Sequence, residues 1–405
     1  MLAMAYASRD NKRELESLDL SPPGSSGLRR GERVHVVFSI DTMSIGGTEM
    51  NAVRTAERLD RDRYRLTVVT LRGDGPLAER YERIGVPIVR FPIYSLYGPA
   101  TLRQGVRLAS FLRRERVSIV HCHDQYSNFF TTLSARAAGV PAVIASKRWL
   151  HSPLRYRISN GIGYRAASKV LANSAHVAES LATVDRLAAE RVVVLPNFVD
   201  EAAFTPPSAA ERAAWVRELR LEDADPVIGI VASLLPIKDH HTLLRATSLL
   251  TSRWPRLRLV IVGKGPMLDE LQAFARELGI ADAVRFAGLR PETPSFHHLF
   301  DVSVLCSTSE GFPNSLVEAM AAARPIVATA VGGVRDAVRD GENGLLVPPR
   351  DPQRLADAIA SLLADRARAA EMGRAGARRA RAEFDARVVI SDLERLYENL
   401  LQSRN

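Results

Sequence analysis

Short apolar runs alternate with helical patterns along most of the chain, and this alternation restricts the fold more than any other feature. The run Val34–Ile40 is a candidate strand, and Met50, Val53, Ala56 and Leu59 then recur at helical spacing. Similar runs lie at 66–71, 87–91, 119–122, 143–145, 169–173, 191–195, 227–231, 257–262, 284–288, 302–305 and 325–329. This order predicts parallel sheets covered by helices on both faces, with ligands bound beyond the carboxyl ends of the strands.

The length of the chain suggests two such domains. Its 405 residues can form two α/β units, each with its own core. The Thr-Pro-Pro-Ser segment at 205–208 has the composition of a linker. We therefore expect a disordered leader at 1–30, a first domain at 31–204, a second domain at 205–384 and a final amphipathic helix at 385–405.

Composition is that of an ordinary soluble globular protein. Hydrophobic residues make up 46% and charged residues 25% of the sequence, and no apolar run reaches the length of a membrane span. The first 30 residues lack the apolar core of a signal peptide. Cys122 and Cys306, the only cysteines, each end a candidate strand in different halves, which indicates buried thiols rather than a disulfide.

Positive charge is concentrated in the first half of the chain. Residues 1–200 contain 29 Lys and Arg against 19 Asp and Glu, whereas the remainder has 26 against 27. Basic and aromatic residues are interleaved at Lys147, Arg148, Trp149, Arg155 and Arg157. Such a region suits nucleic acid, an anionic membrane surface or an acidic substrate, or it is simply a solvated surface. Because the chain contains no recognisable nucleic-acid-binding module, we expect no nucleic-acid partner.

The polar loop between the strand at 302–305 and the helix formers at 316–323 is the strongest candidate site. Asn314 and Ser315 offer capping oxygens after Pro313, and the free amides of the helix start suit an anion. Glu310 and Glu318 flank these amides, and their carboxylates accept hydrogen bonds from hydroxyl groups. A ligand rich in both phosphates and hydroxyls, such as a nucleotide sugar, fits this pattern.

Other strand ends carry weaker signals. Gly46 and Gly47 follow the first strand, where glycine allows a phosphate to approach the backbone. Lys238 follows the strand at 227–231 and suits a phosphate oxygen. His121 and His123 share a face of a strand, so a metal pair is an alternative, but two histidines with no third placed ligand are more often structural.

Two Asp-x-Asp sequences raise the alternative of a metal site. They are Asp60-Arg61-Asp62 and Asp223-Ala224-Asp225, and each lies in a turn before a candidate strand rather than at a ligand-facing strand end. We interpret both as turn residues. We therefore expect neither a metal nor another cofactor.

Several of these motifs together resemble one enzyme family. Glu310 and Glu318, with seven residues between them and Gly-Phe-Pro after the first, closely resemble the donor-site signature of family 4 glycosyltransferases, a retaining family with the GT-B fold. Gly46-Gly47-Thr48-Glu49, the His-x-His ending at His123 and Val262–Pro266 resemble further family motifs. Leu234 and Lys238 match the Gly-Arg-Leu-x-x-x-Lys box, but Ala232 and Ser233 replace its Gly and Arg. Phe198 similarly replaces a usual Gly in the Pro-Asn-Gly-Val-Asp segment near the domain junction.

The resemblance implies two Rossmann-like domains facing across a cleft, with residues 385–405 returning to the first domain. It implies that Glu310 holds the donor sugar, Glu318 the ribose and Lys238 the diphosphate, while Gly47 approaches the phosphates and His123 faces the transferred sugar. The predicted catalytic residues are thus His123, Lys238 and Glu310. The predicted donor-binding residues are Gly46, Gly47, Ser233, Lys238, Gly263, Glu310, Gly311, Phe312, Asn314, Ser315, Leu316 and Glu318.

The resemblance also implies a function: retaining, metal-independent transfer of a sugar from a nucleotide diphosphate sugar to a glycan or lipid-linked acceptor, in cell-envelope or exopolysaccharide synthesis. A nucleotide-sugar epimerase of the same fold and a noncatalytic nucleotide-sugar-binding partner remain alternatives, and the missing Arg at Ser233 favours the latter. We expect the basic and aromatic residues Lys147, Arg148, Trp149, Arg155 and Arg157 to face an anionic or membrane-borne acceptor. The protein would then work in the cytoplasm or at the inner face of the membrane.

Overall fold

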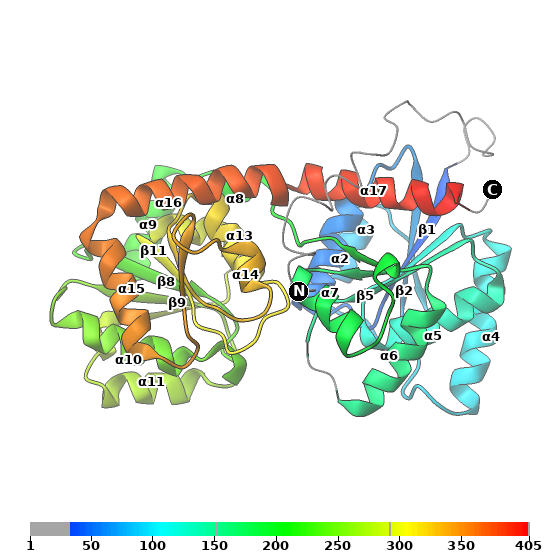
Figure 1. Cartoon of the computed structure of the whole chain (residues 1–405), viewed down its shortest axis with the longest axis horizontal. Helices are drawn as coiled ribbons and strands as arrows, with labels where there is room; N and C mark the ends of the chain where they lie inside the picture. Colours follow the sequence, from blue (N-terminus) through cyan, green and yellow to red (C-terminus); the bar gives the residue numbers. More distant parts are fainter. Residues whose placement is uncertain (1–32, 151–152, 291–292, 404–405) are drawn as a thin grey trace. The chain divides into compact units, whose positions relative to one another are not determined.

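The chain divides into two compact units, as seen in a computed structural model that describes residues 33–150, 153–290 and 293–403 (Figure 1). Unit 1 contains the described residues up to Leu195 and from Ile390 onward, and unit 2 runs from Pro196 to Val389. The predicted leader at 1–30 lies outside the described residues. Each unit is built on one parallel sheet, as the alternation of strand and helix patterns predicts.

Unit 1 contains a seven-stranded sheet in the order β3-β2-β1-β4-β5-β6-β7. Its strands are β1 (Val34–Ile40), β2 (Tyr64–Thr70), β3 (Ile88–Arg90), β4 (Ile119–Cys122), β5 (Ala142–Lys147), β6 (Lys169–Ala172) and β7 (Val192–Val194). Its helices are α2 (Gly47–Arg58), α3 (Ala78–Arg83), α4 (Pro99–Arg114), α5 (Gln125–Ala138), α6 (Leu154–Ala166) and α7 (Ala175–Thr183).

Side chains of the strands alternate between two apolar layers, because successive residues of a strand point to opposite faces of the sheet. Val36 and Phe38 pack with helices α2 and α3. Val37 packs with α4 and α5 on the other face. Both faces of the central strand β1 are thus buried, which explains why it is apolar except for the buried His35 and Ser39.

Unit 2 contains a six-stranded parallel sheet in the order β10-β9-β8-β11-β12-β13. The strands are β8 (Val227–Val231), β9 (Arg258–Val262), β10 (Val284–Gly288), β11 (Val302–Leu305), β12 (Ile326–Thr329) and β13 (Gly344–Val347). The helices are α8 (Glu201–Phe204), α9 (Ala209–Glu218), α10 (His240–Thr251), α11 (Leu268–Glu277), α12 (Thr293–Phe296), α13 (Asn314–Ala321), α14 (Val334–Ala337), α15 (Pro352–Ala364) and α16 (Arg366–Arg379).

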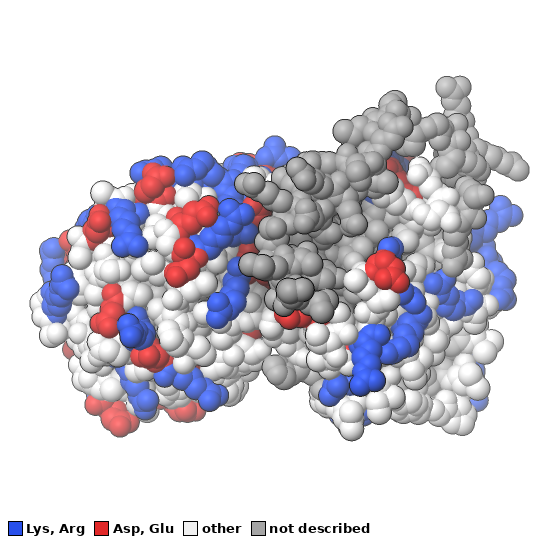
Figure 2. All heavy atoms as spheres, viewed as in Figure 1, with Lys and Arg blue, Asp and Glu red and all other residues white. Residues whose placement is uncertain are grey.

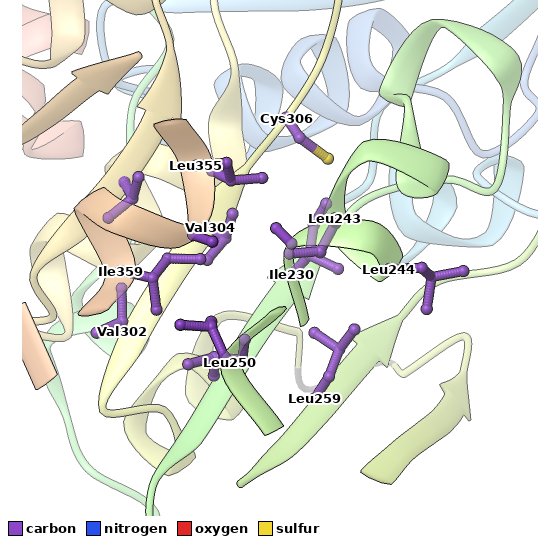
Figure 3. Close-up of a cluster of buried hydrophobic side chains, with 14 of the residues drawn as sticks. Ile230, Leu243, Leu244, Leu250, Leu259, Val302, Val304, Cys306, Leu355 and Ile359 are labelled. Atoms are coloured by element: carbon purple, nitrogen blue, oxygen red, sulfur yellow. The ribbon is translucent and has the colours of Figure 1, made fainter. Parts of the chain in front are cut away.

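The largest core cluster of unit 2 lies between the sheet and helices α10, α11 and α15. Figure 3 shows Ile230 and Val304 of neighbouring strands packed with Leu243 of α10 and with Leu355 and Ile359 of α15. Burial of this kind contributes about 25 cal/mol per Å² of apolar surface. Cys306 and, in unit 1, Cys122 are buried free thiols, as the sequence predicts.

The division between the units falls between Leu195 and Pro196, nine residues before the predicted position. The side-chain Nδ2 of Asn197 donates hydrogen bonds to Phe312 O and Asn314 Oδ1, and Val199 forms a β-bridge with Asp385. These contacts attach the segment to unit 2. The Thr-Pro-Pro-Ser segment at 205–208 therefore lies inside unit 2, where the Ser208 side chain caps α9.

The last helix, α17 (Ala386–Gln402), is divided between the units after Val389. Leu393 and Tyr397 are buried in the core of unit 1, and Tyr397 Oη lies 2.8 Å from His121 Nδ1. The end of the chain thus packs with the first domain. No helix among the described residues has the length and apolar character that crossing a bilayer requires.

Candidate functional site

Three loops at the carboxyl edge of the unit 2 sheet run side by side. They follow β8, β9 and β11, and backbone hydrogen bonds join them: Leu234 N donates to Lys264 O at 3.0 Å, and Thr308 N donates to Ile237 O at 2.8 Å. We call these three segments the donor loops (232–239, 263–267 and 306–313). Residues far apart in the sequence are brought together here, at the edge where α/β sheets bind ligands.

Lys238 and Glu310 form an ion pair between two of the donor loops. Lys238 Nζ lies 2.5 Å from Glu310 Oε1, and Ser307 Oγ donates to the same oxygen at 2.6 Å. The side chains are only 21% and 10% exposed, so solvent screens the pair weakly. Among the described residues no hydrogen bond occupies Glu310 Oε2, which leaves one carboxylate oxygen for a ligand hydroxyl.

Glu318 lies one turn into α13 and is buried beside a histidine that the sequence analysis did not identify. His297 Nε2 is 3.8 Å from Glu318 Oε2, and His297 Nδ1 is 3.1 Å from Ser303 Oγ. Strand β11 thus orients the imidazole, which in turn contacts the carboxylate. The only sequence signal was the His-His pair at 297–298 directly before β11.

The start of α13 differs from the prediction that Asn314 and Ser315 cap the helix. Pro313 is the N-cap residue and no side chain caps it. Asn314 Oδ1 instead accepts a hydrogen bond from Asn197 Nδ2 at 2.7 Å. The first-turn amides are therefore not satisfied by side-chain caps, a condition that favours an anion at this helix end.

The remaining predicted donor residues shape the backbone around the ion pair. Gly263 has φ +148, and a Cβ there would lie 1.9 Å from Ala232 O, so only glycine lets these two loops approach. Phe312 is buried against Phe384 with ring centroids 5.5 Å apart. Leu316 is likewise buried, whereas Gly311 and Ser315 are half-buried. Ser233 is exposed, at the position where the family pattern has Arg.

In unit 1, the predicted glycine loop and His123 lie at the carboxyl edge of the sheet. Gly46 is the N-cap of α2, and Gly47 is its first residue. His123 is fully buried, with its ring stacked 4.1 Å from that of His121 and at 4.8 Å from Phe38. Neither ring nitrogen of His123 has a hydrogen-bond partner among the described residues. Burial holds the pKa of His123 well below its usual value, so the ring is neutral at physiological pH.

An acidic pair near His123 was not predicted. Asp124 Oδ2 accepts from Asp41 N at 3.1 Å, while the Asp41 carboxylate accepts from Tyr126 N and Ser127 N, both at 2.9 Å. Burial raises the pKa of Asp41 to about 6 and raises that of Asp124 well above its usual value. The pair fixes the start of α5 to the end of β1. Asp41 directly follows β1 and Asp124 follows β4 by two positions, which was the available sequence signal.

The basic and aromatic residues of unit 1 do not form one exposed surface, which corrects the prediction for Lys147. Lys147 is buried at the end of β5, and its Nζ lies 2.6 Å from Asp185 Oδ2 and 2.9 Å from Ser180 Oγ. Burial lowers the pKa of Arg148 to about 10, and Trp149 is half-buried. Only Arg155 and Arg157, on α6, are exposed as predicted.

The two Asp-x-Asp sequences lie in turns, as predicted. Asp60 Oδ1 accepts from Asp62 N at 2.9 Å, and the Asp225 carboxylate pairs with Arg256 and Arg366. Within the described ranges, no group of three or more His, Cys, Asp and Glu side chains is arranged to hold a metal ion.

Comparisons with known proteins extend over both units. The family model described as Glycosyltransferase Family 4 matches residues 45–203, and the model described as Glycosyl transferases group 1 matches residues 211–379. A D-inositol 3-phosphate glycosyltransferase of Stackebrandtia nassauensis is 33% identical over 313 residues, 71% of this chain and 69% of the relative. A GDP-mannose-dependent alpha-(1-6)-phosphatidylinositol monomannoside mannosyltransferase of Mycobacterium tuberculosis is 35% identical over 256 residues, 60% of this chain and 66% of the relative.

Solved structures show the same fold at lower identity. Anabaena HepE in complex with UDP-glucose has a TM-score of 0.79 and 22% identity, over 91% of this chain and 100% of that chain. A glycosyltransferase from Rickettsia africae has a TM-score of 0.81 and 16% identity, over 91% and 99%. The family is assigned from the sequence relatives: this chain belongs to the family 4 glycosyltransferases.

Proposed function

We propose that this protein transfers a sugar from a nucleotide diphosphate sugar to a glycan or lipid-linked acceptor, with retention of anomeric configuration and without a metal ion. One observation carries the proposal: the Lys238–Glu310 pair at the carboxyl edge of the unit 2 sheet, beside the uncapped start of α13. A cation and free backbone amides bind the phosphates of a nucleotide diphosphate sugar, and a carboxylate accepts hydrogen bonds from the hydroxyl groups of its sugar.

Each group would have a separate task. The Lys238 ammonium and the α13 amides would stabilise the charge of the departing diphosphate, the role that metal ions fill in other transferases. Glu310 Oε2 would accept a hydrogen bond from a donor-sugar hydroxyl, while Lys238 and Ser307 hold Oε1. Glu318, which lies beside His297, would hold the ribose hydroxyls.

The chemical step would form a bond between an acceptor oxygen and the anomeric carbon as the bond from that carbon to the diphosphate breaks. The proton of the acceptor hydroxyl would pass to the departing phosphate oxygen. Neutral His123 would face the transferred sugar, where it donates or accepts a hydrogen bond without adding charge. Membership of the family is what supports retention of the anomeric configuration in this proposal.

Ser233 stands where the family pattern has an arginine, so another cation would be needed near the diphosphate. Lys264 is exposed on the neighbouring donor loop, and its carbonyl oxygen accepts the hydrogen bond from Leu234 N. We propose that Lys264 contributes part of the missing charge. A lysine supplies a point charge in place of the two-pronged contact of an arginine, so weaker donor binding is expected.

Transfer at the inner face of the membrane, in cell-envelope or exopolysaccharide synthesis, is the setting we propose. Leu154, Ile158 and Ile162 are all exposed on α6 at a spacing of four residues, which places them on one face of the helix. Exposed Arg155 and Arg157 flank this apolar stripe, and an anionic lipid surface suits both features. In the view of Figure 2, unit 1 displays basic side chains with few acidic ones, whereas acidic and basic side chains are intermixed over unit 2.

The decisive experiment is product analysis by mass spectrometry with GDP-mannose and UDP-glucose, each incubated with and without phosphatidylinositol or inositol 3-phosphate. We expect a glycosylated acceptor that NMR shows to retain the donor's anomeric configuration, in the presence of EDTA. A changed sugar nucleotide without acceptor would indicate the epimerase alternative. Binding of the nucleotide sugar with no turnover on any acceptor would favour the noncatalytic alternative.

Membrane association needs its own test, flotation with vesicles of phosphatidylcholine that contain or lack an anionic lipid. We expect binding to the anionic vesicles and its loss in Ile158→Ser. Equal recovery with both vesicle types would contradict the membrane part of the proposal and leave the transferase part standing.

A further inference from the structure

Unit 1 contains a cavity of about 270 Å³ at the carboxyl edge of its sheet. Tyr94 and Tyr97 line it from the connection between β3 and α4, and Tyr126 lines it from the first turn of α5. Arg155 and Tyr156 line it from the first turn of α6. All of these segments follow the carboxyl ends of parallel strands, which is where ligands bind in such sheets. The volume suits a single ring with one substituent rather than a long chain.

The cavity combines aromatic rings with phenol hydroxyls. Tyr126 Oη and Tyr156 Oη lie 3.4 Å apart, and Tyr97 Oη lies 3.2 Å from Ser159 Oγ. The contact between the two phenols raises the pKa of Tyr126 and lowers the pKa of Tyr156. The carbon-bound hydrogens of a sugar or polyol ring can pack on the aromatic faces, while its hydroxyls bond to the phenols.

Arg155 in the lining, and Arg72 stacked on Tyr126 beside the cavity, make the rim positive. The Arg155 guanidinium carbon lies 4.7 Å from the ring centroid of Tyr156, and that of Arg72 lies 4.6 Å from the centroid of Tyr126. Among the described residues neither guanidinium forms an ion pair with a carboxylate. Asp41 is the acid beside Tyr126, and its oxygens already accept hydrogen bonds from the Tyr126 and Ser127 amides. The rim therefore favours an anionic group, and a phosphate matches the planar donors of arginine.

We propose that this cavity binds the phosphorylated sugar or polyol ring of the acceptor, with the phosphate on Arg155 and Arg72 and the ring against Tyr126 and Tyr156. The proposal rests on the proposed function, since it identifies the acceptor as a phosphate-bearing ring compound. The same chemistry occurs in a free sugar phosphate and in a lipid head group. Exposed Leu154 and Ile158 lie in the same helix as Arg155 and would meet the lipid in the second case.

The test is isothermal titration of the full chain with myo-inositol 1-phosphate, myo-inositol and inorganic phosphate, alongside flotation with phosphatidylcholine vesicles containing phosphatidylinositol or phosphatidylserine. The variants are Arg155→Gln and Tyr156→Ala, which alter the rim and the ring platform separately. Arg103→Gln is the matched control, because Arg103 is exposed on α4 and does not line the cavity. Binding of UDP and GDP is measured in every variant as a check on unit 2.

We expect saturable binding of myo-inositol 1-phosphate that each cavity variant weakens about tenfold or more and Arg103→Gln leaves unchanged. If only phosphatidylinositol vesicles show this pattern, the ring is that of a lipid head group. Equal binding of inorganic phosphate or phosphatidylserine, equal affinity in wild type and both cavity variants, or no binding of any probe would overturn the proposal. Failure of UDP and GDP to bind would instead contradict the proposed function and leave a positive cavity result intact.

Discussion

The two units have the same architecture, yet their charged residues are used differently. In unit 2, Lys238 and Glu310 meet at a strand end while the second carboxylate oxygen stays open. In unit 1, Lys147 and Asp185 meet at a strand end with only 9% and 8% of their side chains exposed. The comparison shows two uses for a lysine at the carboxyl end of a parallel strand. Its side chain can lie where a ligand could reach it, as that of Lys238 does, or it can form a buried ion pair that holds a neighbouring segment in place, as that of Lys147 does. Four predictions test this difference, from the largest expected effect to the smallest.

The Lys147–Asp185 pair should be structural. Lys147→Ala leaves the Asp185 carboxylate buried without its partner, and breaking a buried pair in this way costs about 3–5 kcal/mol. Chemical denaturation should show this loss, whereas Arg157→Ala on the exposed face of α6 should stay within about 0.5 kcal/mol of wild type. The double variant Lys147→Met, Asp185→Leu should recover most of the loss. A single-variant cost as small as that of Arg157→Ala would place Lys147 on the ligand side instead.

The Lys238–Glu310 pair should be functional. Lys238→Ala removes the charge that would face the departing diphosphate in the proposed reaction, and we expect kcat/KM to fall about 10²–10³-fold. The loss of stability should be smaller than that of Lys147→Ala, because the Lys238–Glu310 pair is more exposed. Lys169→Ala is the matched control, because within the described part of the chain Lys169 Nζ bonds only to the Glu190 carbonyl oxygen, at 2.5 Å. Unchanged turnover in Lys238→Ala would remove this residue from the site and support a noncatalytic role.

Low pH should lower the stability of unit 1, because the buried His121 then gains a proton. Burial lowers the pKa of His121 from 6.5 to about 3, so the stabilisation is complete above pH 6.5 and is lost as pH falls from 6.5 toward 3. The slope contributed by this group is at most about 1.4 kcal/mol per pH unit. His121→Gln keeps a partner for Tyr397 and should flatten the acid branch of the unfolding curve.

A histidine in unit 2 provides the comparison. Burial lowers the pKa of His240 to about 4, so His240→Gln should flatten the acid branch of unit 2 and leave that of unit 1 unchanged. An acid branch of unit 1 that is identical in wild type and His121→Gln would show that other groups control it.

The smallest effect should come from restoring the family pattern at Ser233. Ser233→Arg adds a guanidinium to an exposed position on the first donor loop, and we expect the affinity for the nucleotide diphosphate to rise about threefold to tenfold. In Lys264→Ala the gain should be larger, because the neighbouring cation is then absent. No gain in either background would indicate that the diphosphate lies elsewhere.

Much of the fold followed from the sequence because strand and helix periodicity is local. The strands at 34–40, 119–122, 227–231, 284–288 and 302–305 lie where the apolar runs predicted them. The boundary between the units was harder to predict from the sequence. It depends on hydrogen bonds from Asn197 to residues more than a hundred positions away.

The candidate site was predictable where a motif gathers its residues within one loop, as between Glu310 and Glu318. It was not predictable where the partner is remote. The contact of His297 with Glu318 and the burial of Lys147 by Asp185 each depend on loops that the sheet brings together. The sequence also suggested capping by Asn314, whereas the remote Asn197 takes its side-chain oxygen instead.

The most direct test of the account is a crystal structure of the protein with a nucleotide diphosphate sugar bound. The account predicts the diphosphate between Lys238 Nζ and the first amides of α13, with a sugar hydroxyl on Glu310 Oε2 and the ribose hydroxyls on Glu318. A nucleotide bound away from the donor loops, with the Lys238–Glu310 pair unchanged, would contradict it.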